Sequence, residues 1–368
     1  MRKTLLLCLA MGIFLSVNAV TPTKVAYLTF QKDMLTSPKA GTSPIPTTVI
    51  NDPIIQVLKS DPNLDVTVKA LTSVLATDVI SDLGDYDVII IQESFGGTAE
   101  ILSASKNNGL GGALALKNIP KPFIYNKMYA LQKSRALTST TTTAVGKECD
   151  GTLANGTLKI KVESSALNND LFKGCTFTGS TLDSLKLFNV LATDSGRIGA
   201  TNSVKALNYA SNLTVTGSTL LAQPAVLAST FPLSLGINYF SSGATISGAE
   251  ATATPSTETL KAPAFFLGMN FGAICANGGK NITEEGLTIW RNAVYILAGL
   301  PVPSTKAVLP STAVKPIDAT ATVKSVEYFT VNGLKVKTPS NGVYVKRTTF
   351  ENGAVKLDKM VLAEPMMK

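Results

Sequence analysis

The stretch Asp85-Tyr86-Asp87-Val88-Ile89-Ile90-Ile91 ends in four consecutive β-branched residues. Such an unbroken apolar run is typical of a strand that is covered on both of its faces, as in a parallel sheet. The run is followed by Gln92-Glu93-Ser94-Phe95-Gly96-Gly97, a polar turn that contains two glycines. We therefore expect a buried central strand that opens into a polar turn at its carboxyl end.

The neighbouring segments supply the partners of this strand. Apolar runs predict further strands over residues 24–30, 64–71 and 121–125. Apolar residues at helical spacing predict helices over residues 49–60 and 72–83, and a third helix, rich in small residues, is expected to end near Lys117. Alternating strands and helices imply right-handed crossovers, so we expect an α/β fold, a three-layer sandwich with a mostly parallel sheet.

The rest of the main domain contains more strands and one well-marked helix. Strands are expected over residues 157–162, 184–190 and 262–269, and antiparallel strands over residues 208–247. The helix is expected over Asn281 to Gly299, with Asn281 as its cap and Glu284 three residues on. Gly299 and Pro301 are expected to end it.

The two ends of the chain indicate export. Residues 1–19 have a basic start, an apolar run from Leu5 to Val17 and a small-residue cleavage site at Val17-Asn18-Ala19, which is the pattern of a signal peptide. The apolar run is too short to cross a bilayer, so no transmembrane segment is expected. We expect a main domain over residues 20–300, a Pro-rich linker over 301–316 and a small all-β domain over 317–368.

Composition removes several classes of function. The net charge of +8 comes from scattered Lys and Arg rather than from a basic stripe, which argues against nucleic acid as a partner. The chain has no histidine, which excludes Ser-His-Asp and Cys-His catalysis and His-ligated metals. We expect no metal site and no cofactor. Cys149 and Cys175 form a candidate disulfide in an oxidising compartment, and the alternative is that the cysteines are small buried hydrophobes.

The C-terminal segment resembles a known export signal. It contains Tyr328-Phe329-x-x-x-Gly333-x-x-Val336, then Gly342-Val343-Tyr344-Val345, then Lys359-Met360-Val361-Leu362. This pattern resembles the sorting domain of the type IX secretion system of Bacteroidetes, although residues 363–367 extend past its commonest ending. The resemblance implies passage through the periplasm, recognition by the outer-membrane secretion machinery and a final place outside the cell or on its surface. The alternative is a small appended β-sandwich that binds a ligand.

The main domain is similar, more loosely, to the class I glutamine amidotransferase-like superfamily. The similarity rests on Lys24 to Leu28, Tyr86 to Ile91, Asn169 to Gly174 and Phe266 to Met269, and on the helix that follows Gly286. It implies a flavodoxin- or amidotransferase-like fold. The superfamily's Gly-x-Cys-x-Gly nucleophile elbow is missing, because the chain after Tyr125 reads Asn126-Lys127-Met128. Amidotransferase activity is therefore not expected.

Candidate site residues follow from the expected sheet, because open α/β sheets bind ligands beyond the carboxyl ends of their strands. Glu93 is the foremost candidate, since partial burial there would suit a carboxylate to acid–base work. The alternative is that Glu93 caps a helix or forms an ion pair with Lys127. The turn that begins at Ser94 is a candidate anion-binding turn at a helix N-terminus, and the alternative is a plain turn between strand and helix. The candidate binding residues are Asp33, Glu93, Ser94, Asn126, Lys127 and Asn270.

Two functions of different classes remain. The first is a non-catalytic binding protein, secreted or on the cell surface, with a glycan or peptide ligand. The second is a carbohydrate-active hydrolase that uses carboxylates such as Glu93 and Asp33, which would have to lie at the separation that glycosidases require. Cys275 could serve as a nucleophile only if a base were available to it, and buried packing is the alternative.

Overall fold

The computed structural model describes only part of the chain. It describes residues 21–30, 52–96, 98–131, 146–148, 158–189, 207–211, 213–225, 233–248, 257–310, 323–330, 333–340, 342–350 and 355–362. The predicted signal peptide, Asp33 and Cys149 lie outside these residues. The chain divides into two units, Met1–Leu309 and Pro310–Lys368, and each is considered by itself.

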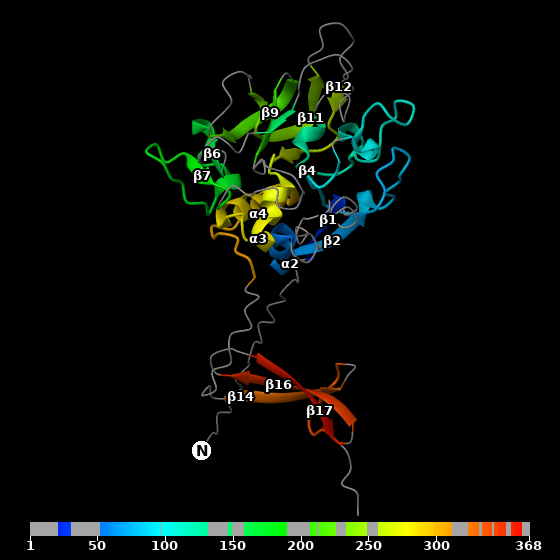
Figure 1. Cartoon of the computed structure of the whole chain (residues 1–368), viewed down its shortest axis with the longest axis vertical. Helices are drawn as coiled ribbons and strands as arrows, with labels where there is room; N and C mark the ends of the chain where they lie inside the picture. The colour runs from blue at the N-terminus through cyan, green and yellow to red at the C-terminus, as the bar shows by residue number, and fades with distance from the viewer. Residues whose placement is uncertain are drawn as a thin grey trace, which may run out of the picture. The chain divides into compact units, whose positions relative to one another are not determined.

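The first unit is built on a ten-stranded mixed sheet (Figure 1). Its order is β2-β1-β3-β4-β13-β11-β9-β6-β7, and β12 pairs with β11. The strands are β1 (Thr23–Phe30), β2 (Leu64–Leu71), β3 (Val88–Ile91), β4 (Phe123–Tyr125), β6 (Lys159–Val162), β7 (Ser184–Lys186), β9 (Leu213–Pro224), β11 (Ile237–Gly248), β12 (Thr257–Thr259) and β13 (Ala264–Phe266).

One half of this sheet is parallel. β1 pairs with β2 and β3, β3 with β4, and β4 with β13, all in parallel. These are the strands expected near residues 24–30, 64–71, 88–91, 121–125 and 262–269. All four residues of β3 are fully buried, which agrees with the unbroken β-branched run that predicted a strand covered on both faces.

The other half of the sheet is antiparallel, and this overturns the predicted fold class. β13, β11, β9, β6 and β7 pair in succession as antiparallel neighbours, as do β11 and β12. Among the described residues far more lie in strands than in helices. The expectation of a helix-rich three-layer α/β sandwich with a mostly parallel sheet is therefore wrong.

Two of the predicted helices are absent from the described chain. Residues 72–83 form turns, because polar side chains there bond to the local backbone: Asp78 Oδ2 accepts from the Leu75 amide at 2.7 Å. The apolar residues that suggested a helix are not buried, since Val79 is 83% exposed. Residues 98–117 contain only short 3₁₀ turns, and Asn107, Asn108 and Gly111 adopt positive φ angles that a helix excludes.

Three α-helices are present in the described part of this unit. They are α2 (Pro53–Ser60), α3 (Phe271–Gly279) and α4 (Glu284–Ala298). Pro53 occupies the first turn of α2, a position that suits proline, and Gly299 ends α4 in the left-handed conformation as expected. The cap of α4 is Thr283, whose hydroxyl accepts from the Gly286 amide at 3.2 Å. The prediction that Asn281 caps this helix was wrong, because Asn281 is buried and donates instead to the backbone of α3.

The two faces of the sheet are covered differently. The face that contains Val25, Tyr27 and Ile90 packs against the three helices, with Trp290 of α4 in the centre. The other face, which contains Ile89 and Ile91, packs against 3₁₀ turns and loops and against a second sheet. That three-stranded sheet consists of β5 (Gly146–Glu148), β8 (Asn208–Ser211) and β10 (Leu233–Leu235), in the order β10-β8-β5. Non-helical segments thus take the place of the helices that a doubly wound fold would put there.

The first part of the predicted linker packs on the first unit. Val302 and Ala307 are buried in its core, and Arg291 of α4 donates to the carbonyl of Thr305 at 2.6 Å. None of the described helices is both long and apolar enough to span a membrane.

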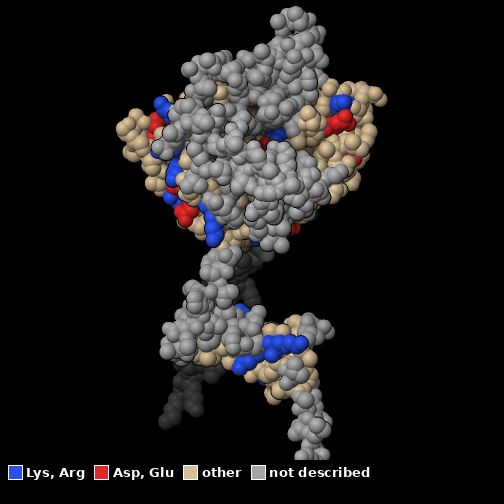
Figure 2. All heavy atoms as spheres, viewed as in Figure 1, with Lys and Arg blue, Asp and Glu red and all other residues tan. Residues whose placement is uncertain are grey.

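The second unit contains one four-stranded antiparallel sheet in its described residues. Its order is β15-β14-β16-β17, with β14 (Val323–Thr330), β15 (Lys335–Val336), β16 (Gly342–Phe350) and β17 (Val355–Leu362). This is one strand more than the sequence indicated, and these strands make one layer rather than the two of a sandwich. Figure 2 shows Lys and Arg side chains in a band on the visible face of this unit. Two of its cations, Lys335 and Arg347, pair with Glu327.

Candidate functional site

The carboxyl ends of β1, β3, β4 and β13 meet at one edge of the parallel half of the sheet. Five of the six predicted binding residues lie there, and the sixth, Asp33, lies outside the described residues. Glu93 and Ser94 follow β3, Asn126 and Lys127 follow β4, and Asn270 follows β13. The parallel pairing brings them together as the sequence predicted.

Glu93 and Lys127 form an ion pair at this edge. Glu93 Oε1 accepts from Lys127 Nζ, and the same ammonium donates to the Glu93 carbonyl at 2.9 Å. Glu93 Oε2 accepts from the amide of Phe271, the first residue of α3, at 3.2 Å. The side chains of Glu93 and Lys127 are only 11% and 7% exposed. Both carboxylate oxygens are therefore engaged within the protein, as in the alternative in which Glu93 pairs with Lys127 and caps a helix.

Ser94 fastens the turn after β3 to the end of β1. Its hydroxyl accepts from the Phe30 amide at 2.9 Å and shares a hydrogen bond with the Thr29 hydroxyl at 2.8 Å. No α-helix begins directly after this turn in the described part of the chain. The next regular segment there is a three-residue 3₁₀ turn, Glu100–Leu102. The expected helix N-terminus behind Ser94, and the anion site built on it, are thus not formed.

Asn126 connects three strands below the ion pair. Its Nδ2 donates to Gln92 Oε1 and to the Met269 carbonyl, both at 2.6 Å, and its Oδ1 accepts from the Met269 amide at 2.8 Å. Asn126 and Gln92 are both completely buried. These bonds hold the ends of β3, β4 and β13 in register, which is a structural task.

The hydrogen bonds continue inward to Asp52. Gln92 Nε2 donates to the Tyr27 hydroxyl at 2.6 Å, and that hydroxyl donates to Asp52 Oδ2 at 2.6 Å. Asp52 Oδ1 caps α2 by accepting from the Ile54 amide at 2.9 Å. We call Asp52, Tyr27, Gln92 and Asn126 the buried polar chain. Burial raises the pKa of Asp52 to about 6, and burial together with Asp52 raises the pKa of Tyr27 well above its ordinary value.

Sequence reasoning missed Tyr27 and Asp52. Asp52 had a usable signal, because an aspartate directly before a proline at a helix start is a common N-cap arrangement. Tyr27 had none, since a tyrosine within an apolar strand reads as a packing residue.

Asn270 and Cys275 belong to the helix that follows β13. Asn270 Oδ1 accepts from the Ala273 amide at 3.3 Å, so Asn270 caps α3. Cys275 is completely buried, and burial, with a smaller contribution from Asp52, raises the pKa of its thiol well above the ordinary value. The thiol stays protonated and is no nucleophile. The described residues contain no group of three or more Cys, Asp or Glu side chains that could hold a metal ion.

The predicted disulfide stays a prediction, because Cys149 lies outside the described residues. Cys175 is partly buried, with its Sγ 3.9 Å from the Glu285 carbonyl oxygen. Burial, reinforced by the Glu285 carboxylate, raises the pKa of Cys175 to about 12.

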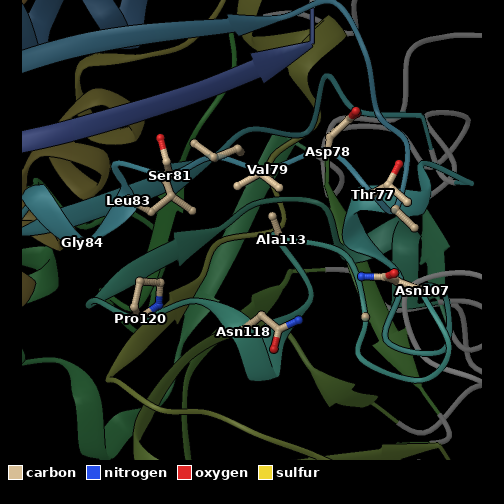
Figure 3. A pocket seen from close by; sticks show the side chains of 13 residues that line it. Thr77, Asp78, Val79, Ser81, Leu83, Gly84, Asn107, Ala113, Asn118 and Pro120 are labelled. Carbon is tan, nitrogen blue, oxygen red and sulfur yellow. The ribbon is translucent and has the colours of Figure 1, made fainter.

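A separate pocket opens between two loops (Figure 3). It has a volume of about 510 Å³, and residues 76–84 and 107–120 form its two walls. Figure 3 shows Val79 and Ala113 at its centre, with Asn107 and Asn118 on the opposite wall from Ser81. None of the predicted site residues lines it. The two segments are those in which helices had been expected.

The lining of this pocket is neutral apart from one carboxylate. Thr77 and Ser81 contribute hydroxyls, and Asn107 and Asn118 contribute amides. Asp78 is the one charged lining residue, and its Oδ2 already accepts from the Leu75 amide. Three large apolar side chains beside or within the pocket are solvent-exposed: Leu75, Val79 and Leu110. A concave surface with apolar walls and a few polar groups is typical of small-molecule and ligand sites.

No protein-family model, no curated protein and no solved structure matches the chain.

Proposed function

We propose that the chain is a non-catalytic binding protein, secreted or held on the cell surface, whose first unit binds a glycan or a peptide in the pocket between residues 76–84 and 107–120. The observation that carries this proposal is the internal pairing of the groups at the carboxyl edge of the sheet. Glu93 is engaged by Lys127 and the α3 backbone, and the Cys275 thiol is buried and protonated. These groups hold the fold together and leave none of their reactive atoms open to a substrate.

The hydrolase alternative gains no support from the same geometry. A glycosidase needs one carboxylate that can give up or accept a proton and a second one across the substrate. Both oxygens of Glu93 accept hydrogen bonds from within the protein, and its proposed partner Asp33 lies outside the described residues.

The pocket lining sets the kind of ligand. The hydroxyls of Thr77 and Ser81 and the amide of Asn107 can each donate and accept, while Val79 supplies apolar contact. The Asn118 amide nitrogen already donates to the carbonyls of Leu110 and Gly112. A neutral ligand with both polar and apolar surface fits this lining better than a strongly charged one. A short peptide segment and a small oligosaccharide both have that character.

Export is the second part of the proposal. The signal-peptide pattern at residues 1–19 and the strand pattern over residues 328–362 support delivery by a type IX-like pathway. The division of the chain after Leu309 is consistent with a C-terminal unit that acts as a separate sorting domain.

Ligand binding is tested by screening the mature chain against glycan and peptide libraries by thermal shift and by array binding. Ser81 is an exposed residue on the pocket wall, so Ser81→Trp should fill the pocket and abolish any binding found there. Ser165→Trp, at an exposed serine outside the pocket, is the matched control and should bind like the wild type. Silence of the wild type across both libraries, or equal binding by Ser81→Trp, would overturn the pocket assignment.

Export is tested by deleting Pro310–Lys368 in the native host. The first unit should then fold but accumulate in the periplasm, because its core does not depend on the second unit. Continued appearance of the truncated protein outside the cell would refute the sorting role.

A further inference from the structure

A regular array of hydroxyl groups covers one face of the sheet where β9, β11 and β12 run side by side. We call this array the threonine face. Its members are Thr214, Thr216, Thr245, Ser247, Thr257 and Thr259.

The register of the three strands places these residues in two rows. Thr245 of β11 lies opposite Thr216 of β9 and Thr259 of β12, which makes the first row. Ser247 lies between Thr214 and Thr257 in the same way and makes the second. Neighbouring strands lie about 4.8 Å apart and alternate residues on one strand about 6.8 Å apart, so the array has a repeating spacing in both directions.

The alternating residues show that the array faces solvent. Val215, Ile246 and Glu258 lie between the two rows and point to the other face of the sheet, where Ile246 and Glu258 are buried. On the threonine face, the side chains of β9 and β12 are exposed and those of β11 are half-buried. The array therefore lies on an open surface, and the core on the other side of the sheet holds its backbone in place.

The hydroxyls are only partly satisfied by one another. Thr216 shares a hydrogen bond with Thr245 at 2.6 Å, and Ser247 shares one with Thr257 at 2.7 Å. The hydroxyls of Thr214 and Thr259, at opposite corners, make no hydrogen bond within the described part of the chain. Cross-strand pairing alone accounts for the two bonded pairs, but it leaves these two corner hydroxyls without a role.

The chemistry of the face favours one kind of ligand. None of the six positions is charged, although the chain as a whole has a net charge of +8, so the face has nothing to attract an ionic polymer. Each hydroxyl can both donate and accept, and each threonine adds a methyl group.

We propose that the threonine face is a second binding surface, for a neutral polysaccharide. A polymer of repeating hydroxylated rings matches a repeating hydroxylated surface, with donors and acceptors on both sides. This surface is separate from the loop pocket, because none of its residues lines that pocket.

Affinity electrophoresis of the mature chain tests this proposal, with dextran, mannan or galactomannan in the gel and alginate as an anionic polymer. Retardation by at least one neutral polymer is expected, whereas retardation by alginate reports only the net charge of +8 and should not change in variants of the threonine face. The variant Thr216→Val/Thr245→Val removes two hydroxyls but keeps β-branched residues in the strands. It should bind about tenfold more weakly, which corresponds to about 1.4 kcal/mol.

Two further variants keep the outcome decisive. Thr216→Ser/Thr245→Ser retains the hydroxyls and should keep the affinity, even if the valine variant proves unstable. Ser81→Trp closes the loop pocket and should leave retardation by the neutral polymer unchanged. Retardation by alginate alone, no retardation by any neutral polymer, equal binding by the valine and serine variants, or self-association that the valine variant abolishes would each overturn the assignment.

Discussion

Replacing Asp52 by asparagine should change how the stability of the first unit depends on pH. Asp52 is completely buried, caps α2 and accepts a hydrogen bond from the Tyr27 hydroxyl. Asparagine is as good a helix cap as aspartate, so Asp52→Asn keeps the cap and removes the ionisable group.

The size of the effect follows from the pKa of the buried carboxyl. Burial raises this pKa from its ordinary value of 3.8 to about 6. The folded state therefore holds the proton more tightly than the unfolded state does. Asp52 then contributes its full stabilisation below about pH 4, and that contribution is lost as the pH rises through about 6. A shift of about two pKa units corresponds to about 3 kcal/mol of unfolding free energy.

Urea unfolding at pH 4, 5, 6 and 7 provides the measurement. The fluorescence of Trp290 reports the first unit selectively, because this buried residue is the single tryptophan of the chain. The stability of the wild type relative to Asp52→Asn should fall by about 3 kcal/mol between pH 4 and pH 7. Asp65→Asn, at an exposed aspartate of β2, controls for the loss of one carboxylate. Parallel pH profiles for the wild type and Asp52→Asn would refute the reasoning.

Three further predictions use the same unfolding assay at neutral pH. Lys127→Met should destabilise the first unit by about 3 kcal/mol, because it leaves the Glu93 carboxylate buried without its cation. Adding Glu93→Gln should restore part of the lost stability, and no recovery in the double variant would contradict this. Gly268→Ala should cost about 3 kcal/mol, because its new Cβ would lie 2.2 Å from a backbone oxygen of β8. Gly299→Ala, with a similar φ but open space around it, should cost only about 1 kcal/mol, and equal losses at the two glycines would refute the steric argument. Thr283→Ala should cost about 1 kcal/mol through the lost α4 cap, and an unchanged midpoint would argue against that cap.

Patterns that depend on local chemistry were readable in the sequence. The unbroken run Val88–Ile91 predicted a strand buried on both faces, and the apolar stripe before Gly299 predicted α4. The placement of Glu93 and Lys127 at the ends of adjacent parallel strands also brought them together as expected. In the first two cases the residues of the segment itself determine its structure, and in the third the parallel pairing of β3 and β4 does so.

Features that depend on competition between local and distant contacts were not readable. Residues 72–83 have helical apolar spacing, but the Asp78 carboxylate accepts from the Leu75 amide, and Val79 is exposed rather than covered by a partner surface. Antiparallel strands over residues 208–247 were expected, but the pairing of β11 with β13, which joins them to the parallel half in one mixed sheet, was not, because neither segment by itself indicates its partner. Tyr27 was missed because its partner Asp52 comes from a distant segment, the start of α2.

The position of β13 in the sheet has a consequence for how the chain folds. β4 ends at Tyr125 and its neighbour β13 begins at Ala264, so the two central parallel strands are joined through residues 126–263. During synthesis, β4 must keep an unpaired edge until that whole stretch has emerged. Closing so long a loop loses chain entropy before the contacts between β4 and β13 can offset that loss. Such non-local pairing is therefore slow. We therefore expect the first unit to fold late and slowly, and to rely on protection of that edge until β13 arrives.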